Sequence, residues 1–275
     1  MKFSFIIPTY NRCTQLDHCV ASIINQSYTK ELFEIIVVND GGEIPMLEHN
    51  NLKIINQPNA GPATARNTGA NAAQGEYLIF VDDDCCLDTD WLAEMAPYCK
   101  PNTIFTGFTI NKTNSIYSEA SQLLVSYLHE AWQNTAWHFF ASNNLVINNQ
   151  TFNKLKGFNE QFPLAAGEDR EICFRAKVAT INLLQIPTAI VFHYHHLNFN
   201  KFIKQHLNYG KGAYYFNQVF RSHNKKIPIQ PIFFYKNMLY YPFTQFKFKK
   251  ASPIFILIVL SQFLNILGYL SPKNK

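Results

Sequence analysis

The residues best suited to chemistry are three consecutive aspartates, Asp82–Asp84, which follow the apolar segment YLIFV (Tyr77–Val81). Like charges repel at this spacing, and burying carboxylates without a partner is costly. A positive group must therefore lie beside them. Oxygen ligands suit Mg²⁺ or Mn²⁺, and such ions keep open positions for substrate phosphates. The segment thus predicts a divalent-cation site, although an acidic cluster after a strand can also be a solvated turn.

The first hundred residues must supply the framework that positions these acids. Their apolar runs predict strands that are separated by segments with helical spacing. Near-continuous apolar strands between helices are typical of a parallel sheet covered on both faces, whose ligands bind outside the carboxyl ends of the strands. Asp40 and Asp82–Asp84 both follow such strands and are expected at one sheet edge. The predicted strands are FSFII (Phe3–Ile7), FEIIVVND (Phe33–Asp40), LKIIN (Leu52–Asn56) and YLIFV (Tyr77–Val81).

The middle of the chain is less regular. A helix is expected over Ser118–Gln133, and GEDREICFRAK (Gly167–Lys177) is expected to form a second one. The second helix opens with two acids, which suit the positive end of its dipole. The segment TAIVF (Thr188–Phe192) predicts another strand, which leads into HYHH.

Composition separates two parts of the 275-residue chain. Residues 1–171 carry 10 Lys/Arg and 19 Asp/Glu, whereas residues 172–275 carry 14 Lys/Arg and no acid. Such a basic segment seeks an anionic surface. Its many aromatic residues favour a membrane, and no nucleic-acid partner is expected. The six cysteines form no CxxC pair, and the apolar N-terminal run is too short for a signal peptide, so a cytoplasmic location is expected.

The last apolar run predicts contact with a membrane. Ile254–Leu270 contains 17 uncharged residues, which as a helix reach roughly 25 Å, less than the hydrocarbon core of about 30 Å. Ser261, Asn265 and Gly268 fall on one face of that helix. This amphipathic pattern indicates a helix that lies in the interface, with KFKK (Lys247–Lys250) at its start.

Five motifs in this order resemble the family 2 glycosyltransferases. The resemblance covers about residues 2–212 and implies a GT-A fold, an α/β architecture with a Rossmann-like, mostly parallel central sheet flanked by helices. It also implies transfer of a sugar from a nucleotide-sugar, usually with inversion and a divalent metal. The motifs are IIPTYNR, VVNDGG, GPATARNTGA, GEYLIFVDDDC and GEDREICFR.

The resemblance assigns candidate roles in donor binding. Asp40 matches an acid that contacts the uracil ring, although Asn39 stands where many members have a second Asp. Arg66 matches an arginine near the nucleotide, and a guanidinium can bind a diphosphate or orient an acid. Asp82 and Asp84 match the DxD pair that holds Mg²⁺ or Mn²⁺. The remaining nucleotide-binding candidates are Pro8, Thr9, Tyr10 and Asp83, with Asp82 also counted among them.

The resemblance also assigns the acceptor side. Asp169 matches the base that takes the acceptor's hydroxyl proton during inverting transfer, and Glu168 would hold the acceptor or orient Asp169. Both acids could instead merely cap a helix. His193 matches a histidine that reaches the metal or the diphosphate in similar enzymes. Trp132 and Trp137 could stack on an acceptor sugar or belong to the core.

These features predict three parts: a nucleotide-sugar-binding half (1–100), an acceptor-binding half (101–212) and a basic, aromatic, membrane-associating helical region (213–275). The expected enzyme is a hexosyltransferase-type glycosyltransferase of polysaccharide biosynthesis on the cytoplasmic face of the cell membrane. Its donor would be a UDP-sugar, and its acceptor a glycan or lipid-linked molecule.

Other functions stay open or are disfavoured. The principal alternative is an inactive nucleotide-sugar-binding or scaffold protein of a polysaccharide-synthesis complex. A nucleotidyltransferase normally has a Gly-rich loop with Lys or Arg after the first strand, and PTYNR replaces that loop here. An NAD-dependent oxidoreductase is disfavoured because no GxGxxG follows a strand.

Overall fold

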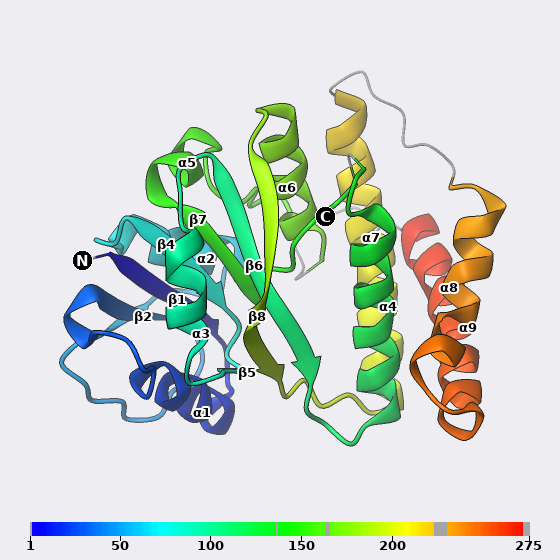
Figure 1. Ribbon diagram of the computed structural model, residues 1–275, viewed down its shortest axis with the longest axis horizontal. Helices are drawn as coiled ribbons and strands as arrows, with labels where there is room; N and C mark the ends of the chain where they lie inside the picture. The colour runs from blue at the N-terminus through cyan, green and yellow to red at the C-terminus, as the bar shows by residue number, and fades with distance from the viewer. Residues whose placement is uncertain (1, 136, 163–165, 223–229, 272–275) are drawn as a thin grey trace.

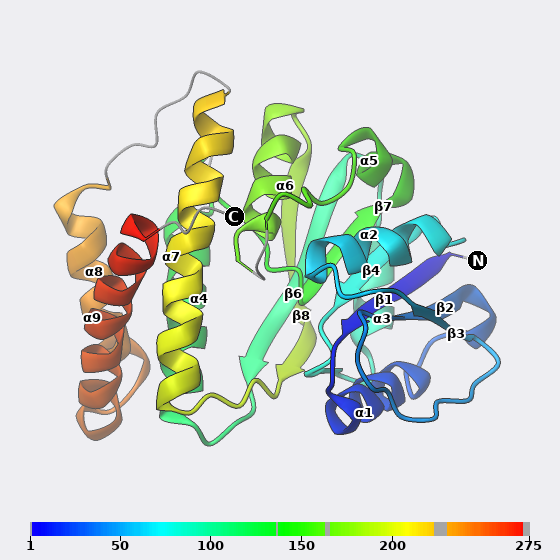
Figure 2. The same cartoon turned by 180° about the vertical axis from the view of Figure 1, so that it is seen from behind.

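A computed structural model describes residues 2–135, 137–162, 166–222 and 230–271. Within them, one eight-stranded sheet is flanked by helices on both faces, and a group of long helices stands beside it (Figures 1 and 2). The strands are β1 (Phe3–Thr9), β2 (Phe33–Asn39), β3 (Leu52–Asn56), β4 (Tyr77–Val81), β5 (Cys85–Leu87), β6 (Thr103–Asn111), β7 (Asn144–Asn148) and β8 (Asn182–His193). The helices are α1 (Cys13–Ile24), α2 (Pro62–Ala72), α3 (Trp91–Met95), α4 (Ile116–Trp132), α5 (Asn149–Lys154), α6 (Glu168–Val178), α7 (Phe199–Ser222), α8 (Ile232–Gln245) and α9 (Phe248–Leu270), with short 3₁₀ turns at Lys30–Leu32 and Ala96–Tyr98.

The strand order is β3-β2-β1-β4-β7-β6-β8-β5. The predicted parallel block is confirmed, because β3, β2, β1 and β4 all run in the same direction. The rest of the sheet is mixed: β7 is antiparallel to both β4 and β6, β8 is parallel to β6, and β5 is antiparallel to β8. The α/β class and the GT-A-type arrangement therefore hold, with a mixed second half.

The apolar strands fill two cores, one on each face of the sheet. Alternate residues point to opposite faces, so Phe5 and Ile79 pack with α1 and α3, while Ile6 and Phe80 pack on the side of α2, α5 and α6. This double burial explains why the strands read as almost continuous apolar runs. It also fixes the ends of β1, β2 and β4 at one edge, where Asp40 and Asp82–Asp84 follow.

A third core joins the long helices α4, α7, α8 and α9. Helices α7 and α9 approach closely because both carry glycine at their contact: a Cβ on Gly210 would collide with the carbonyl oxygen of Asn265, and one on Gly268 would collide with that of Leu207. The helical region predicted for residues 213–275 is thus present among residues 213–222 and 230–271. Its first helix, however, begins at Phe199, inside the predicted acceptor half.

Helix α9 has 23 residues, six more than the apolar run predicted from sequence, because it begins at Phe248. At 1.5 Å per residue α9 reaches roughly 35 Å, which exceeds the hydrocarbon core of about 30 Å. The expectation that this helix is too short to span a membrane was therefore wrong. By length and composition it is the one helix of the described residues that could cross a membrane.

Candidate active site

The three aspartates lie beside positive groups, as their crowding requires. Arg12, just after β1, places Nη1 2.8 Å from Oδ1 of Asp83 and 3.0 Å from Oδ2 of Asp84. Thr9 donates its hydroxyl to the other oxygen of Asp83 at 2.8 Å. The third acid, Asp82, pairs with Arg66 Nη2 at 2.7 Å. Each of the three carboxylates therefore contacts an arginine, with Arg12 shared by Asp83 and Asp84.

Asp83 and Asp84 have pKa values that are shifted in opposite directions. Burial, against the opposing charge of Arg12, raises the pKa of Asp83 to about 6. Burial acts in the same direction on Asp84, but the hydrogen bond and charge of His193, together with Arg12, hold its pKa below the usual value. Asp84 is thus kept as a carboxylate, the form that binds a cation.

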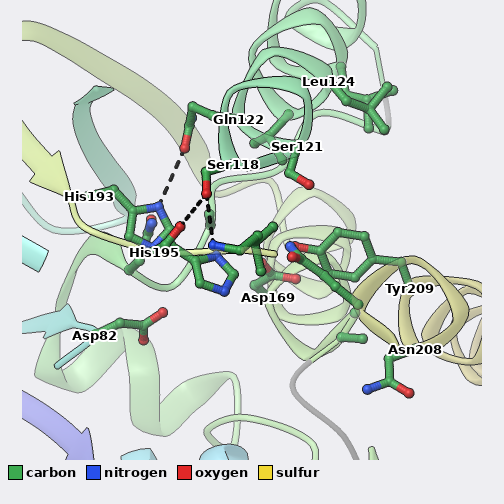
Figure 3. Close-up of a pocket in the computed structure, with 18 of the residues that line it drawn as sticks. Asp82, Ser118, Ser121, Gln122, Leu124, Asp169, His193, His195, Asn208 and Tyr209 are labelled. Atoms are coloured by element: carbon green, nitrogen blue, oxygen red, sulfur yellow. Dashed lines mark hydrogen bonds between the residues drawn. The ribbon is translucent and has the colours of Figure 1, made fainter. Parts of the chain in front are cut away.

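Strand pairing brings His193 to Asp84. The short strand β5 pairs with β8 so that Cys85 lies opposite His193, and the amide of Tyr194 donates to the carbonyl of Asp84 at 2.8 Å. His193 Nε2 then lies 3.3 Å from Asp84 Oδ1, and its Nδ1 lies 3.5 Å from Oε1 of Gln122 on α4 (Figure 3). Gln122 therefore orients the ring toward the acid.

The ligand atoms of Asp84, Cys85 and His193 lie within 4.8 Å of one another. Carboxylate oxygen suits Mg²⁺ or Mn²⁺, whereas imidazole nitrogen is a ligand of transition metals. Burial raises the pKa of the Cys85 thiol well above its usual value, so this group stays protonated and is a poor ligand. Asp82, the other ligand predicted from sequence, is turned to Arg66 instead, and its role as a ligand stays a prediction.

Arg66 links the aspartates to the second acidic motif. Its guanidinium, on α2 and only 3% exposed, donates to Asp82 and also to Glu168 Oε1 at 3.0 Å. Glu168 and Asp169 begin α6, after Gly167 in the left-handed region at φ 98°. Oε2 of Glu168 has no partner among the described residues. One buried carboxylate oxygen of Glu168 is therefore left without a hydrogen bond among the described residues.

Burial and mutual repulsion shift both acids of this motif. Burial, reinforced by the charge of Asp169, raises the pKa of Glu168 to about 7. Burial also raises the pKa of Asp169, against the backbone amide of Arg170, which donates to Oδ1 at 2.7 Å. A carboxyl with a raised pKa is a stronger base when ionised, which is what proton removal requires.

One cavity of about 990 Å³ joins the two motifs. Figure 3 shows Asp169 between Asp82 and the histidines on one side and Tyr209 and Asn208 of α7 on the other. Of the residues predicted from sequence, the cavity is lined by Arg66, Asp82, Asp84, Glu168, Asp169 and His193.

The other nucleotide-binding candidates do not line this cavity. Asp40, 5% exposed, accepts hydrogen bonds from the Gln57 side chain and from the amides of Ala60 and Gly61 at 2.7–2.9 Å, so it closes the loop before α2. Pro8 lies within β1, Thr9 binds Asp83, and Tyr10 is half exposed. Their contact with a nucleotide stays a prediction.

Trp132 is buried in the core and Trp137 is partly buried, and neither lines the cavity, so stacking on an acceptor sugar stays a prediction. Trp132 stacks on Phe234, with ring centroids 5.7 Å apart, and Trp137 packs on Phe220 at 4.9 Å. Arg170 is buried against Trp132, with the guanidinium 5.1 Å from the ring centroid. The sequence analysis missed Arg12 and Gln122. Arg12 could have been found, since it is the first cation after β1 in the quoted PTYNR motif.

The fold and the site define a GT-A-type sugar transferase. The family model described as "Glycosyl transferase family 2" matches residues 4–155. The chain belongs to this family.

Curated relatives agree with this assignment but overlap the chain only in part. "Glycosyltransferase GlyA" of Streptococcus pneumoniae serotype 4 is 40% identical over 33% of this chain and 14% of its own length. "Poly(ribitol-phosphate) beta-glucosyltransferase" of Bacillus spizizenii is 31% identical over 42% of this chain and 20% of its own. "Putative glycosyltransferase EpsH" of Bacillus subtilis is 25% identical over 82% of this chain and 70% of its own. The chain thus matches only a fifth or less of the length of the first two.

Solved structures share the fold. The mannosyltransferase PcManGT from Pyrobaculum calidifontis, in complex with GDP-Man and Mn²⁺, has a TM-score of 0.67 at 14% identity, covering 99% of this chain and 88% of that one. Residues 1–349 of S. aureus TarS, in complex with UDP, give 0.55 at 16% identity, covering 98% and 89%. At this identity the likeness establishes the fold alone.

Proposed function

We propose that this family 2 glycosyltransferase moves a sugar from a nucleotide-sugar, with UDP as the favoured nucleotide, to a glycan or lipid-linked acceptor with inversion. The observation that carries the proposal is the single cavity that holds Asp84 with His193 at one side and Asp169 with Glu168 at another. Cation binding and proton removal are the two tasks that such a transfer needs.

Asp84 and His193 would hold Mg²⁺ or Mn²⁺, with Asp82 as a further candidate. A divalent cation bound there neutralises charge on the departing diphosphate. The complexes of PcManGT with GDP-Man and Mn²⁺ and of GalNAc-T7, another structure that shares the fold, with UDP, GalNAc and Mn²⁺ support this choice of cofactor. Arg12, paired with two of the aspartates, supplies a further positive charge beside the same acids.

Asp169 takes the proton of the acceptor hydroxyl as that oxygen attacks the anomeric carbon from the face opposite the nucleotide. The bond from this carbon to the diphosphate oxygen breaks, and the nucleoside diphosphate leaves with the electron pair. Glu168, fixed by Arg66 through one oxygen, keeps the other available for an acceptor hydroxyl.

The helices α8 and α9 would hold the site against the cytoplasmic face of a membrane. Helix α9 packs along α7 and α4, which carry Lys211 and Glu130 among other charges. A helix bound to such neighbours is better suited to lying along the surface than to crossing it. Liposome flotation with anionic and neutral vesicles tests this placement.

The decisive experiment is a screen of UDP-, GDP- and dTDP-sugars for hydrolysis with Mn²⁺, with Mg²⁺ and with EDTA. We expect metal-dependent release of UDP, and a loss of about 10²- to 10³-fold in Asp84→Asn. Asp88→Asn, which changes an acid outside the cavity, is the matched control. Binding of UDP without turnover of any donor would instead favour the inactive scaffold protein.

A further inference from the structure

The cavity changes character from one side to the other. Next to Asp82 and Asp169 it is lined by ionised and polar groups, whereas α4 contributes Leu124, Val125 and Leu128 to its wall. Binding sites for small molecules usually measure about 300–1,000 Å³. At about 990 Å³ this cavity lies at the upper end of that range, and its wall on the side of α4 is apolar.

The apolar part ends at an opening on the outside of the molecule. Tyr235 of α8 and Ile266 and Leu270 of α9 line the cavity, yet they are 40%, 57% and 70% exposed. A residue that both lines a cavity and contacts solvent lies at a mouth. We call these three residues the mouth.

The mouth lies on an exposed apolar surface of α8 and α9. Helix α9 buries Ile254, Leu257, Ile258 and Leu264 in the third core, yet several of its other large apolar side chains are exposed. Large exposed apolar patches of this kind mark interaction sites. Its exposed members on α9 are Phe248, Ile256, Val259, Phe263, Ile266, Leu267 and Leu270, and α8 adds Ile232, Phe233, Tyr235, Tyr240 and Phe243.

The charge around this surface selects a lipid bilayer as its occupant. Lys236, Lys247 and Lys249 are exposed on the same two helices, and residues 172–275 contain no acid. Aromatic and aliphatic side chains rimmed by lysines suit the boundary between acyl chains and anionic headgroups. The mouth would therefore open toward the acyl chains and headgroups of the bilayer.

Two further cations line the cavity and are exposed to solvent. Lys201 and Lys204, one turn apart on α7, line its wall, and neither forms an ion pair among the described residues. Lys211, on the same helix, does not line it. Unpaired lysines in a cavity that opens toward lipid are suited to a phosphate group carried by that lipid.

We infer that the acceptor is a glycan carried on a long-chain lipid phosphate or diphosphate, whose chain enters the cavity from the bilayer through the mouth. Its phosphate contacts Lys201 and Lys204, and its sugar hydroxyl reaches Asp169. In the transfer this hydroxyl loses its proton to Asp169, its oxygen bonds to the anomeric carbon, and the nucleoside diphosphate departs. The inference rests on the proposed function and specifies its acceptor.

The test measures binding of farnesyl diphosphate, farnesol and inorganic diphosphate to the full chain, with UDP and Mn²⁺ at saturation to fill the donor site. We expect farnesyl diphosphate to bind at least about tenfold more tightly than either other probe, because it alone offers both an apolar chain and a charge. Equal affinity for farnesyl diphosphate and inorganic diphosphate would overturn the inference.

Matched variants locate the binding site. Ile266→Asp/Leu270→Asp places acids in the mouth and is expected to weaken farnesyl diphosphate binding by about tenfold or more, whereas Ile256→Asp/Phe263→Asp changes equally exposed residues of α9 outside the cavity and leaves it within about twofold. Equal effects of the two pairs would overturn the assignment of the mouth.

The lysines have their own control. Lys201→Gln/Lys204→Gln is expected to remove the preference for farnesyl diphosphate over farnesol, and Lys211→Gln is expected to keep it. Retention of the preference in the double variant would refute the phosphate site. Metal-dependent hydrolysis of the donor by the wild type is scored separately: its presence without lipid binding refutes only this inference, and its absence refutes the proposed function.

Discussion

The two sides of the cavity are built from regions that treat charge in opposite ways. On the side of the sheet, two arginines are held in ion pairs: Arg12 pairs with Asp83 and Asp84, and Arg66 pairs with Asp82 and Glu168. On the side of the long helices, Lys201 and Lys204 have no ion pair among the described residues. The sheet region therefore holds its acids in fixed positions through ion pairs. The helical region instead has lysines that are free to bind an anionic ligand.

The family match covers most of the sheet region but not all of it. It ends at residue 155, inside the sheet region, although Glu168 and Asp169 begin the next helix. Buried ion pairs fix the positions of the acids, whereas apolar contacts between helices set the shape of the opposite wall. We interpret the sheet region as the part that sets the chemistry, and α7–α9 as the part that selects the acceptor and the surface.

The largest expected effect tests the base at the boundary of the two regions. Asp169→Asn keeps the size of the side chain but cannot accept the proton, so kcat for transfer should fall by about 10²- to 10⁴-fold, with UDP affinity unchanged. Steady-state kinetics and UDP titration check this. The exposed Asp17→Asn on α1 is the control. A loss below about fivefold would remove Asp169 from the role of base.

The next effect concerns stability on the sheet side. Arg66→Met leaves Glu168 buried without a counterion, and breaking such a pair typically costs about 3–5 kcal/mol of unfolding free energy. Denaturant titration measures the loss. Arg12→Met, whose side chain is 45% exposed in the native protein, should cost markedly less. If both variants lost the same unfolding free energy, the buried ion pairs of Arg66 would not be what stabilises this edge of the sheet.

A smaller effect is expected on the helical side. Lys247→Gln/Lys249→Gln should weaken binding to anionic vesicles by about 1 kcal/mol for each charge removed, without altering UDP binding. Lys53→Gln/Lys100→Gln removes two lysines from the sheet region and should leave vesicle binding unchanged. If both pairs weakened binding alike, the membrane contact would not belong to α9.

The smallest effect is a pH dependence. The raised pKa of Glu168, about 7, and the raised pKa of Asp169 mean that the buried pair takes up a proton as the pH falls. A base must be unprotonated, and a group with a pKa of about 7 is about half ionised at pH 7 and about a tenth ionised at pH 6, so activity should drop about fivefold between these pH values. The charged and titratable groups that surround this buried pair include Arg66, Asp82 and Tyr209.

The variant Glu168→Gln sharpens this test. It removes the neighbouring carboxylate, so the pKa of Asp169 should fall and the acidic limb should move to lower pH. Glu94→Gln, an exposed acid on α3, should leave the profile unchanged. An acidic limb that did not move would show that the two carboxyls do not share a titration.

Much of the sheet could be predicted because its signal is local. Tyr77–Val81 is apolar at every position, which indicates burial on both faces, and Asp82–Asp84 then had to lie at its carboxyl end. The extension of α9 to Phe248 could not be predicted, because KFKK interrupts the apolar run on which the prediction rested. The face of α9 that packs against the rest of the protein could not be predicted either, since an amphipathic pattern does not say which face is buried.

The sequence by itself determined the parallel block β1–β4, the acids at its edge and the basic character of the last hundred residues, because each depends on neighbours along the chain. Only the tertiary structure decided which cation meets which carboxylate, that Cys85 pairs with His193, and that a cavity connects Asp169 to Ile266. Residues that are far apart in sequence meet through packing and strand register, and no local pattern encodes those contacts.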